Sequence, residues 1–266
     1  MGPAETTVSI PGRKQDLVLR FPWLNAAGIL GFGDESAPRI DPARLGAFVT
    51  NPVSLGPRTP SRGERVAHLP GGLLVHTGHP NLGISQVVRR CLAAWQRMAC
   101  PVIVHVLARS PGEVFEICTY LEGLDPVAAI EVGLLEEEPE LGLSLVEAAA
   151  QAELPVLAQL PLTADASWAG EVAQAGANAV VLGAPRGSLP REAGRTLSGR
   201  LYGPCLFPLA LQAVARLAPA LDVPLLAGGG ITNRAERQAL LDAGAAAAVL
   251  DIALWSNPDA VLEREG

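Results

Sequence analysis

Short apolar runs that alternate with helical segments constrain the fold of this chain more than any other feature. Eight such runs follow one another between Pro22 and Asp251, each short enough for a single strand. Regular strand–helix alternation predicts a parallel sheet covered by helices. Eight units in about 240 residues fit a closed α/β TIM (β/α)₈ barrel, and an open doubly wound sheet is the alternative. The predicted strands are 22–28, 47–50, 101–107, 127–132, 155–160, 179–182, 224–227 and 246–251.

Three segments do not belong to this alternation. Thr6–Ile10 and Leu17–Arg20 flank a Pro-Gly turn, which predicts a β-hairpin within residues 1–21. Residues 52–83 are rich in Pro, Gly and Arg and too long for a plain connection. We therefore expect one barrel domain over residues 1–266, with 52–83 as an active-site loop insertion that holds a small hairpin. Arg186–Tyr202 is predicted to be a glycine-rich loop.

Helices are predicted between the strands and after the last one. Ser110 is the expected cap of one helix, and Thr232 or Asn233 is the expected cap of another that ends at Ala243. The remaining predicted helices are 40–45, 86–100, 112–124, 143–152, 166–175 and 203–217, with one more at the C-terminus.

Composition and charge exclude several classes of function. A net charge of −7 argues against nucleic acid as a partner. The sequence holds no apolar run of about 18 residues and no signal-peptide pattern, so we expect no membrane span. The four cysteines lack C-x-x-C spacing, which indicates a reducing, cytoplasmic compartment. We expect a small-molecule ligand at the C-terminal ends of the strands and allow for a homodimer.

A strand, three glycines and a helix start follow one another in Val223–Thr232. Gly228, Gly229 and Gly230 let backbone N–H groups approach a ligand closely. The N-terminus of a helix attracts anions, and barrels commonly bind phosphate on the loops after strands seven and eight. The stretch is therefore a predicted phosphate site, and a tight turn that binds nothing is the alternative.

Several motifs occur in one order along nearly the whole chain. They are Asn25-Ala26-Ala27-Gly28, Gly46-Ala47-Phe48-Val49-Thr50, Asn81-Leu82-Gly83, Pro101-Val102-Ile103-Val104, Ala129-Ile130-Glu131-Val132, Gly199-Arg200-Leu201-Tyr202-Gly203-Pro204 and Pro208-Leu209-Ala210-Leu211, followed by Pro224–Ile231. In this order and spacing they resemble the dihydroorotate dehydrogenase family, the FMN-dependent barrels of pyrimidine biosynthesis, and above all its soluble class.

The resemblance implies that FMN lies over the strand ends, with its phosphate held by backbone groups after strands seven and eight. The implied cofactor-binding residues are Ala26, Ala27, Gly28, Asn51, Gln159, Tyr202, Gly203, Gly228, Gly229, Gly230, Asp251 and Ile252. The implied substrate residues are Asn81, Gly133, Glu138 and Gly183, and Glu136 aligns with the family's catalytic base.

The chain departs from the family pattern where the chemistry needs charge. The family's two active-site lysines fall at Asn51 and Gln159, and Lys14, the only lysine, lies outside the barrel core. Reduced flavin carries negative charge that a nearby cation stabilises. The Gly-Thr of the family after strand eight becomes Asp251-Ile252. Asp251 would repel a phosphate, so we expect the FMN site to be retained in shape and weakened in charge.

Histidine and arginine supply the other candidate groups. No H-x-H or H-E-x-x-H spacing links His76, His79 and His105, so no metal site is predicted. His105, at the end of strand three, is the best placed for proton transfer. The arginines of the loop after strand six would clamp an anion, and a solvated loop is the alternative. They are Arg186, Arg191, Arg195 and Arg200.

Three functions remain open after this comparison. The expected one is a diverged or inactive family member, a pseudoenzyme that does not oxidise dihydroorotate efficiently. The second is an FMN-dependent oxidoreductase acting on the CH–CH group of dihydroorotate or another small cyclic substrate. The third is a flavin-free barrel enzyme that uses Glu136 or His105 as a base on a phosphorylated substrate.

Overall fold

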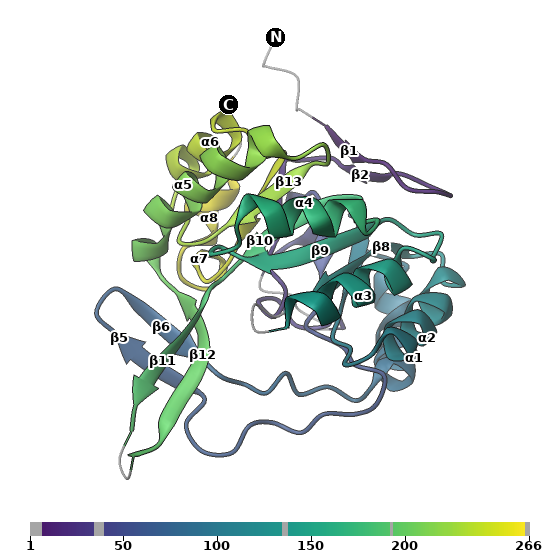
Figure 1. Ribbon diagram of the computed structural model, residues 1–266, viewed down its shortest axis with the longest axis horizontal. Coiled ribbons are helices and arrows are strands. Elements are labelled where there is room, and N and C mark those ends of the chain that lie inside the picture. Colours follow the sequence, from purple (N-terminus) through teal and green to yellow (C-terminus); the bar gives the residue numbers. More distant parts are fainter. Residues whose placement is uncertain (1–6, 35–39, 135–137, 192–193, 264–266) are drawn as a thin grey trace.

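Eight parallel strands form a barrel surrounded by helices (Figure 1). The computed structural model describes residues 7–34, 40–134, 138–191 and 194–263. The strand order is β3-β14-β13-β10-β9-β8-β7-β4, so consecutive barrel strands pair throughout except β3 and β4, which lie at the two ends of this order, and β14 pairs with β3. The barrel prediction is confirmed. The strands are β3 (Trp23–Asn25), β4 (Phe48–Val49), β7 (Val102–Val106), β8 (Val127–Gly133), β9 (Val156–Pro161), β10 (Ala179–Gly183), β13 (Leu225–Gly228) and β14 (Ala247–Leu250).

The seam between β3 and β4 is closed by a side chain. The Asn25 amide nitrogen donates to the Val49 carbonyl at 2.7 Å, and the Val49 N–H donates to the Asn25 amide oxygen at 2.9 Å. One further backbone bond, from Gly46 N–H to the Trp23 carbonyl, joins the two segments at 2.8 Å. Asn25 is fully buried, and its amide joins β3 to β4 in place of the backbone hydrogen bonds that join the other neighbouring strands.

The helices lie close to their predicted positions and begin at well-formed caps. Ser110, Asp165 and Asn233 each accept a hydrogen bond from the backbone N–H three residues on. Predicted segment 40–45 is only a single 3-10 turn, Pro42–Arg44, because Pro42 and the extended Leu45 leave no room for a second turn. The α-helices are α1 (Ile84–Trp95), α2 (Pro111–Glu122), α3 (Pro139–Ala149), α4 (Ala166–Gln174), α5 (Phe207–Leu217), α6 (Arg234–Asp242), α7 (Ala253–Ser256) and α8 (Pro258–Leu262).

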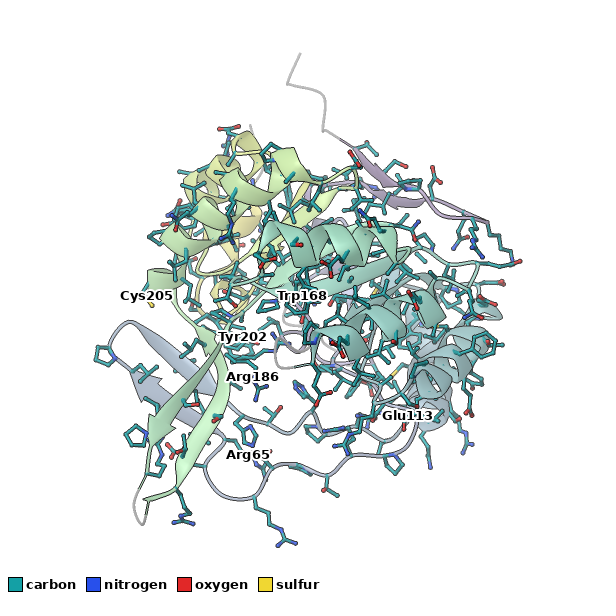
Figure 2. All side chains as sticks on the ribbon, in the orientation of Figure 1. Arg65, Glu113, Trp168, Arg186, Tyr202 and Cys205 are labelled. Atoms are coloured by element: carbon teal, nitrogen blue, oxygen red, sulfur yellow. The ribbon has the colours of Figure 1, made fainter. Side chains whose placement is uncertain are left out.

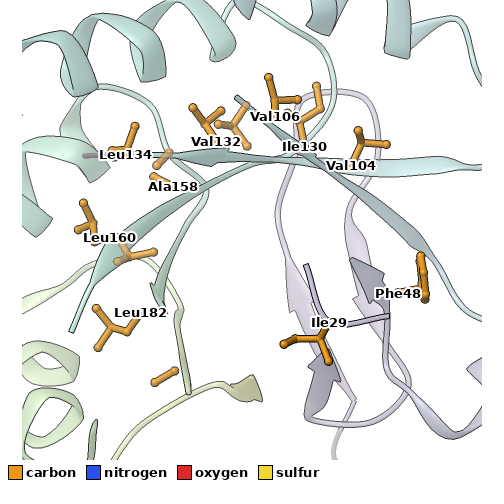
Figure 3. Close-up of a cluster of buried hydrophobic side chains, with 14 of the residues drawn as sticks. Ile29, Phe48, Val104, Val106, Ile130, Val132, Leu134, Ala158, Leu160 and Leu182 are labelled. Carbon is orange, nitrogen blue, oxygen red and sulfur yellow. The ribbon is translucent and has the colours of Figure 1, made fainter. Parts of the chain in front are cut away.

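Two apolar layers hold the barrel together, since successive strand side chains point to opposite faces. The outer layer fills the space between strands and helices, and Figure 3 shows Val104, Ile130 and Leu160 within it. The inner layer fills the barrel itself with residues such as Ile103 and Leu157. In the described parts of the chain, no helix is both long enough and apolar enough to cross a membrane.

The predicted N-terminal hairpin covers one end of the barrel. Strands β1 (Val8–Ile10) and β2 (Leu17–Leu19) pair antiparallel. Ile10, Leu17 and Leu19 are fully buried in the same cluster as the inner barrel residues. The hairpin turn bonds to Glu153, which lies just before β9, so the covered end is the N-terminal end of the strands.

A separate four-stranded sheet stands at the opposite end, where the strands finish (Figure 1). It is built from β11 (Arg186–Pro190), β12 (Thr196–Tyr202), β6 (Gly72–Val75) and β5 (Val66–Leu69), in that order. The small hairpin predicted within 52–83 is confirmed as β5 and β6. The loop predicted for 186–202 is wrong, because that segment forms a second hairpin paired to β6.

The glycine content of the second hairpin has a packing explanation. A Cβ on Gly199 would stand 2.4 Å from the Val75 carbonyl oxygen, and a Cβ on Gly187 would stand 2.6 Å from the Leu201 side chain. Glycine therefore permits close strand contact here rather than marking a loop. Apolar residues on one face, Leu197 and Leu201, pack with Leu74 of β6.

Candidate functional site

A cavity of about 310 Å³ lies between the C-terminal ends of the barrel strands and the four-stranded sheet. Its volume is at the lower end of the roughly 300–1,000 Å³ range of small-molecule pockets. His105, Gly133 and Gln159 contribute from the barrel side, and Arg186 and Tyr202 contribute from the sheet side. Figure 2 shows Arg186 and Tyr202 at this junction. We refer to this space as the arginine cavity.

The wall of the arginine cavity is cationic. Arg58 and Arg200 are half-buried in it, whereas Arg109 and Arg186 lie at its exposed rim. No carboxylate is present among the described residues that line it. Arg200 Nη1 donates to the Ala184 carbonyl at 2.8 Å, which fixes one N–H of a guanidinium that carries five. A cavity walled in this way favours an anionic ligand.

His79 sits among these arginines in an unusual backbone conformation. Its φ is 52°, and it is the only described non-glycine residue with a positive φ. The Thr77 hydroxyl accepts from His79 N–H at 3.1 Å, and Asn81 Nδ2 donates to the His79 carbonyl at 3.1 Å. Burial, followed by the charges of His105 and of nearby arginines, lowers the pKa of His79 to about 3. Near neutral pH it is therefore an uncharged member of the wall.

A buried polar network forms the floor of the cavity. His105 Nδ1 lies 2.6 Å from Glu131 Oε1, and Gln159 Nε2 donates to the same oxygen at 3.1 Å. All three side chains are buried. They lie on the adjacent strands β7, β8 and β9, and His105 and Glu131 are register partners. A carboxylate buried in this way is held by its two donors.

A second, much smaller space lies beside the arginine cavity. Its volume is about 20 Å³, enough for about one water molecule. We call it the glycine slot. Most of the predicted cofactor residues line it: Ala26, Ala27, Gln159, Tyr202, Gly228, Gly229 and Asp251, together with the predicted substrate residue Gly183.

Asp251 presents its carboxylate to the glycine loop. Its Oδ2 accepts from Gly230 N–H at 3.2 Å, and its Oδ1 is buried without a hydrogen-bond partner among the described residues. Burial raises the pKa of Asp251 to about 6, and backbone N–H groups of Gly230, Ile252 and Ala253 oppose that rise. A protein carboxylate thus bonds to the loop where the sequence predicts a phosphate.

Two of the three glycines, Gly228 and Gly230, are also required by packing alone. A Cβ on Gly228 would stand 2.1 Å from the Val249 carbonyl oxygen. A Cβ on Gly230, whose φ is 74°, would stand 2.5 Å from the Gly203 carbonyl oxygen. Close approach of neighbouring backbone therefore explains these residues whether or not an anion binds.

The remaining predicted site residues lie in different places. Gly28 and Gly133 line the arginine cavity. Asn81 is buried behind the cavity wall, where its amide bonds to Ser54, His79 and Gly83. Glu138 is exposed at the start of α3. Glu136 lies outside the described residues. Asn51, Gly203 and Ile252 line neither of the two spaces, and the Asn51 side-chain oxygen is buried without a described partner.

Two functional candidates were missed from sequence, Glu131 as the partner of His105 and Arg58 as part of the cavity wall. A usable signal existed for Glu131, because His105, Glu131 and Gln159 are the polar residues in three successive apolar runs. Parallel neighbours bring such positions together. Arg58 carried no comparable signal, since it reaches the cavity from an irregular segment. No group of three or more metal-ligating side chains occurs among the described residues.

The fold and this geometry define a (β/α)₈ barrel protein with a small-molecule cavity at the C-terminal ends of its strands. The model of the dihydroorotate dehydrogenase family matches residues 13–134. The catalytic subunit of dihydroorotate dehydrogenase B (NAD(+)) from Desulforudis audaxviator is 31% identical over 96% of this chain and 89% of its own length. The corresponding subunit from Trichlorobacter lovleyi is 30% identical, with coverages of 93% and 88%. The chain belongs to the dihydroorotate dehydrogenase family.

A solved structure has the same fold. The dihydroorotate dehydrogenase of Eimeria tenella in complex with ferulenol superposes with a TM-score of 0.78. The match covers 97% of this chain and 82% of the other, at 14% sequence identity. At this identity the similarity supports the barrel architecture and says nothing of the ligand.

Proposed function

We propose that this protein is a diverged member of the dihydroorotate dehydrogenase family that binds a small anionic molecule in the arginine cavity and does not oxidise dihydroorotate efficiently. The observation that carries the proposal is the Asp251 carboxylate, which bonds to Gly230 in the place that the family resemblance assigns to the FMN phosphate. In a family member that depends on tightly bound FMN, an anionic side chain at that position would repel the phosphate of the cofactor.

The residues present fit FMN poorly. The Gly230 N–H that would bind phosphate already serves Asp251. Two like charges about 4 Å apart repel by about 4 kcal/mol at an effective dielectric near 20, before salt screening. The glycine slot of about 20 Å³ has room for about one water molecule and not for a ring system. We therefore propose that FMN binds weakly and that the purified protein does not retain it in stoichiometric amounts.

The two positions where the resemblance implies a lysine also support the proposal of a diverged family member. Gln159 is neutral and its amide donates to Glu131, where the resemblance implies a lysine. Asn51 is neutral as well and lines neither space. Without a cation at either position, the negative charge of a reduced flavin lacks the stabilisation that preorganised charge supplies.

The arginine cavity supplies the positive side of the proposal. It brings arginines from two separate insertions, residues 52–83 and the β11–β12 hairpin, to one space above the strand ends. No carboxylate is among the described residues that line the cavity. A volume of about 310 Å³ suits a small molecule that carries one or two carboxylate or phosphate groups.

A second function is favoured by the relatives. Both are named catalytic subunits of dihydroorotate dehydrogenase B (NAD(+)), and both match this chain along most of its length. On that basis the alternative is an FMN-dependent oxidoreductase that works with a different partner chain rather than as a simple homodimer.

Four measurements on the purified protein decide between these functions. We expect no visible flavin absorbance, weak FMN binding by fluorescence quenching, and binding of oxalate by calorimetry. We also expect dihydroorotate turnover, followed with an artificial electron acceptor and added FMN, far below 1 s⁻¹, a modest enzyme rate by order of magnitude. A yellow protein that turns over dihydroorotate at about 1 s⁻¹ or faster contradicts the proposal and establishes the alternative.

A further inference from the structure

We propose that His105 and Glu131 form a proton-transfer pair, in which His105 removes and returns a proton on a small carbon acid held in the arginine cavity. The proposal rests on the proposed function in one respect, that this cavity binds an anion. It adds an activity that needs no flavin, no metal and no oxidant, and it assigns a role to the buried network beneath the cavity.

The hydrogen-bond pattern defines which ring nitrogen carries the proton. Gln159 Nε2 can only donate, and it donates to Glu131 Oε1 at 3.1 Å. An ionised carboxylate only accepts, so the 2.6 Å contact between that oxygen and His105 Nδ1 is an Nδ1–H donation. The neutral imidazole then keeps its lone pair on Nε2. This is the arrangement in which a carboxylate orients a histidine base.

The second ring nitrogen lies on the cavity side of the network. A Cβ added to Gly133 would stand 2.8 Å from His105 Nε2, and both residues line the arginine cavity. Within the described parts of the chain, the only hydrogen bond of the ring is the one to Glu131. Glycine at position 133 thus keeps the space beside Nε2 open for an atom of a ligand.

The charges around this position suit an anionic intermediate. Arg58, Arg186 and Arg200 line the same cavity, and the charge of each acts on His79 beside His105. Their guanidinium groups can bind a carboxylate and stabilise negative charge that develops next to it. Neutral His79 adds no net charge to this side.

The step itself is a proton abstraction next to a carbonyl group. His105 Nε2 takes a proton from the carbon, the C–H electron pair becomes the C=C bond of an enolate, and the former C=O pair moves onto oxygen. The imidazolium formed is paired with Glu131, and the oxygen charge faces the arginines. Return of the proton to the same carbon exchanges it with solvent, whereas return to a neighbouring atom isomerises the molecule. No atom or electron is left over in either case.

The test combines imidazole ¹⁵N NMR with deuterium exchange, and the chain suits it because it has only four histidines. In the free protein, His105 should be the Nδ1–H tautomer, and saturation with oxalate should move its ring nitrogens toward imidazolium. In E131Q, the tautomer preference should be lost. His105 is identified by the signal missing from H105Q. H68Q is the matched control, since His68 is exposed on β5 and lies outside the cavity lining.

Deuterium uptake from D₂O at the carbon beside the ketone of 2-oxoglutarate and of pyruvate reports the chemistry. We expect the wild type to accelerate uptake into at least one of them, H105Q to lose about 100-fold or more of that acceleration, and H68Q to keep it. E131Q should lose part of the rate with little change in oxalate affinity, which separates positioning from binding.

The outcomes separate the two proposals. If oxalate does not bind, the anionic ligand of the proposed function is wrong. If oxalate binds and neither probe exchanges faster with the wild type than with H105Q, the anion site stands and the proton-transfer pair is overturned. An Nε2–H tautomer in the wild type also overturns it, because the lone pair would then face Glu131.

Discussion

The glycine slot and the arginine cavity share Ala27, Gln159, Arg200 and Tyr202 in their walls, yet the proposed function assigns them opposite responses to an anion. The slot has the backbone of an anion site, and a carboxylate of the protein already bonds to it. The cavity has an irregular backbone and owes its charge to arginines from two insertions. If the proposed function is correct, loop shape is a poor guide to what a site binds, because one carboxylate can oppose the anion that the backbone would accept.

The largest expected effect comes from removing the carboxylate from the slot. Asp251→Gly should tighten FMN binding about 100-fold or more, because repulsion between carboxylate and phosphate is worth several kcal/mol at about 4 Å and about 1.4 kcal/mol corresponds to tenfold. The measurement is FMN fluorescence quenching. Asp222→Gly is the matched control, since it removes the same charge from an exposed position before β13. Equal FMN affinity in Asp251→Gly and wild type would show that the carboxylate does not limit binding.

The pH dependence of stability is the next effect in size. Because burial raises the pKa of Asp251 to about 6 from 3.8, the folded state binds this proton more tightly than the unfolded state. The resulting stabilisation is complete below about pH 4, is lost as pH rises towards about 6, and leaves the protein up to about 3 kcal/mol less stable above that.

Asp251→Asn isolates this contribution, because it removes the titration and keeps the shape of the side chain. Its free energy of unfolding should exceed that of the wild type by about 1–3 kcal/mol at pH 8 and match it near pH 4. Denaturant unfolding across this range measures the difference. A constant gap at every pH would mean that Asp251 is not the titrating group.

The arginine cavity should show a smaller and opposite response. Arg200→Gln removes a charge-assisted contact and should weaken oxalate binding about 10- to 100-fold, since such contacts are worth about 1.5–3 kcal/mol. Arg62→Gln serves as the control, because Arg62 is exposed in the segment before β5 and lies outside the cavity lining. Calorimetry on both variants measures the change in oxalate affinity. An unchanged affinity in Arg200→Gln would place the anion elsewhere.

The smallest effect is expected at His79 in the cavity wall. His79 holds a φ of 52°, which glycine adopts without strain. His79→Gly should therefore leave stability equal or raise it by up to about 1 kcal/mol, despite the loss of a side chain. Thermal unfolding gives the answer, with His76→Gly as the control at a residue of ordinary backbone conformation. A clear loss of stability in His79→Gly alone would assign the imidazole a packing role.

The barrel was predictable because its signal is local. Each apolar run specifies its own strand, and the caps Ser110 and Asn233 specify their helices from one turn of sequence. Only one of the two hairpins in the four-stranded sheet was predictable from the sequence. Its β5–β6 hairpin has a turn signal, whereas β12 depends on contact with β6, more than a hundred residues earlier in the chain. No local pattern distinguishes such a strand from a glycine-rich loop.

The site residues differ in the same way, because some of their positions follow from one local pattern and others depend on contacts between separate segments. Placing His105 at a strand end needed only the position of one strand, and the structure puts it on the cavity as expected. Its pairing with Glu131 needed the register of two strands, and the contact of Asp251 with Gly230 needed the geometry of two loops. The sequence predicted the charge of Asp251 at the phosphate loop, but not that the carboxylate would become a hydrogen-bond partner of that loop.

The side-chain closure at Asn25 also sets where this ring opens first. Elsewhere a strand leaves the barrel only by breaking a ladder of backbone hydrogen bonds, while β3 and β4 are joined only by the two bonds between Asn25 and Val49 and by one backbone bond, from Gly46 N–H to the Trp23 carbonyl. Local openings of a native protein follow the least costly break. In hydrogen exchange the Val49 amide should therefore lose protection before the amides of β8 and β9. The two barrel strands that come first in the sequence are therefore the ones that we expect to separate most easily.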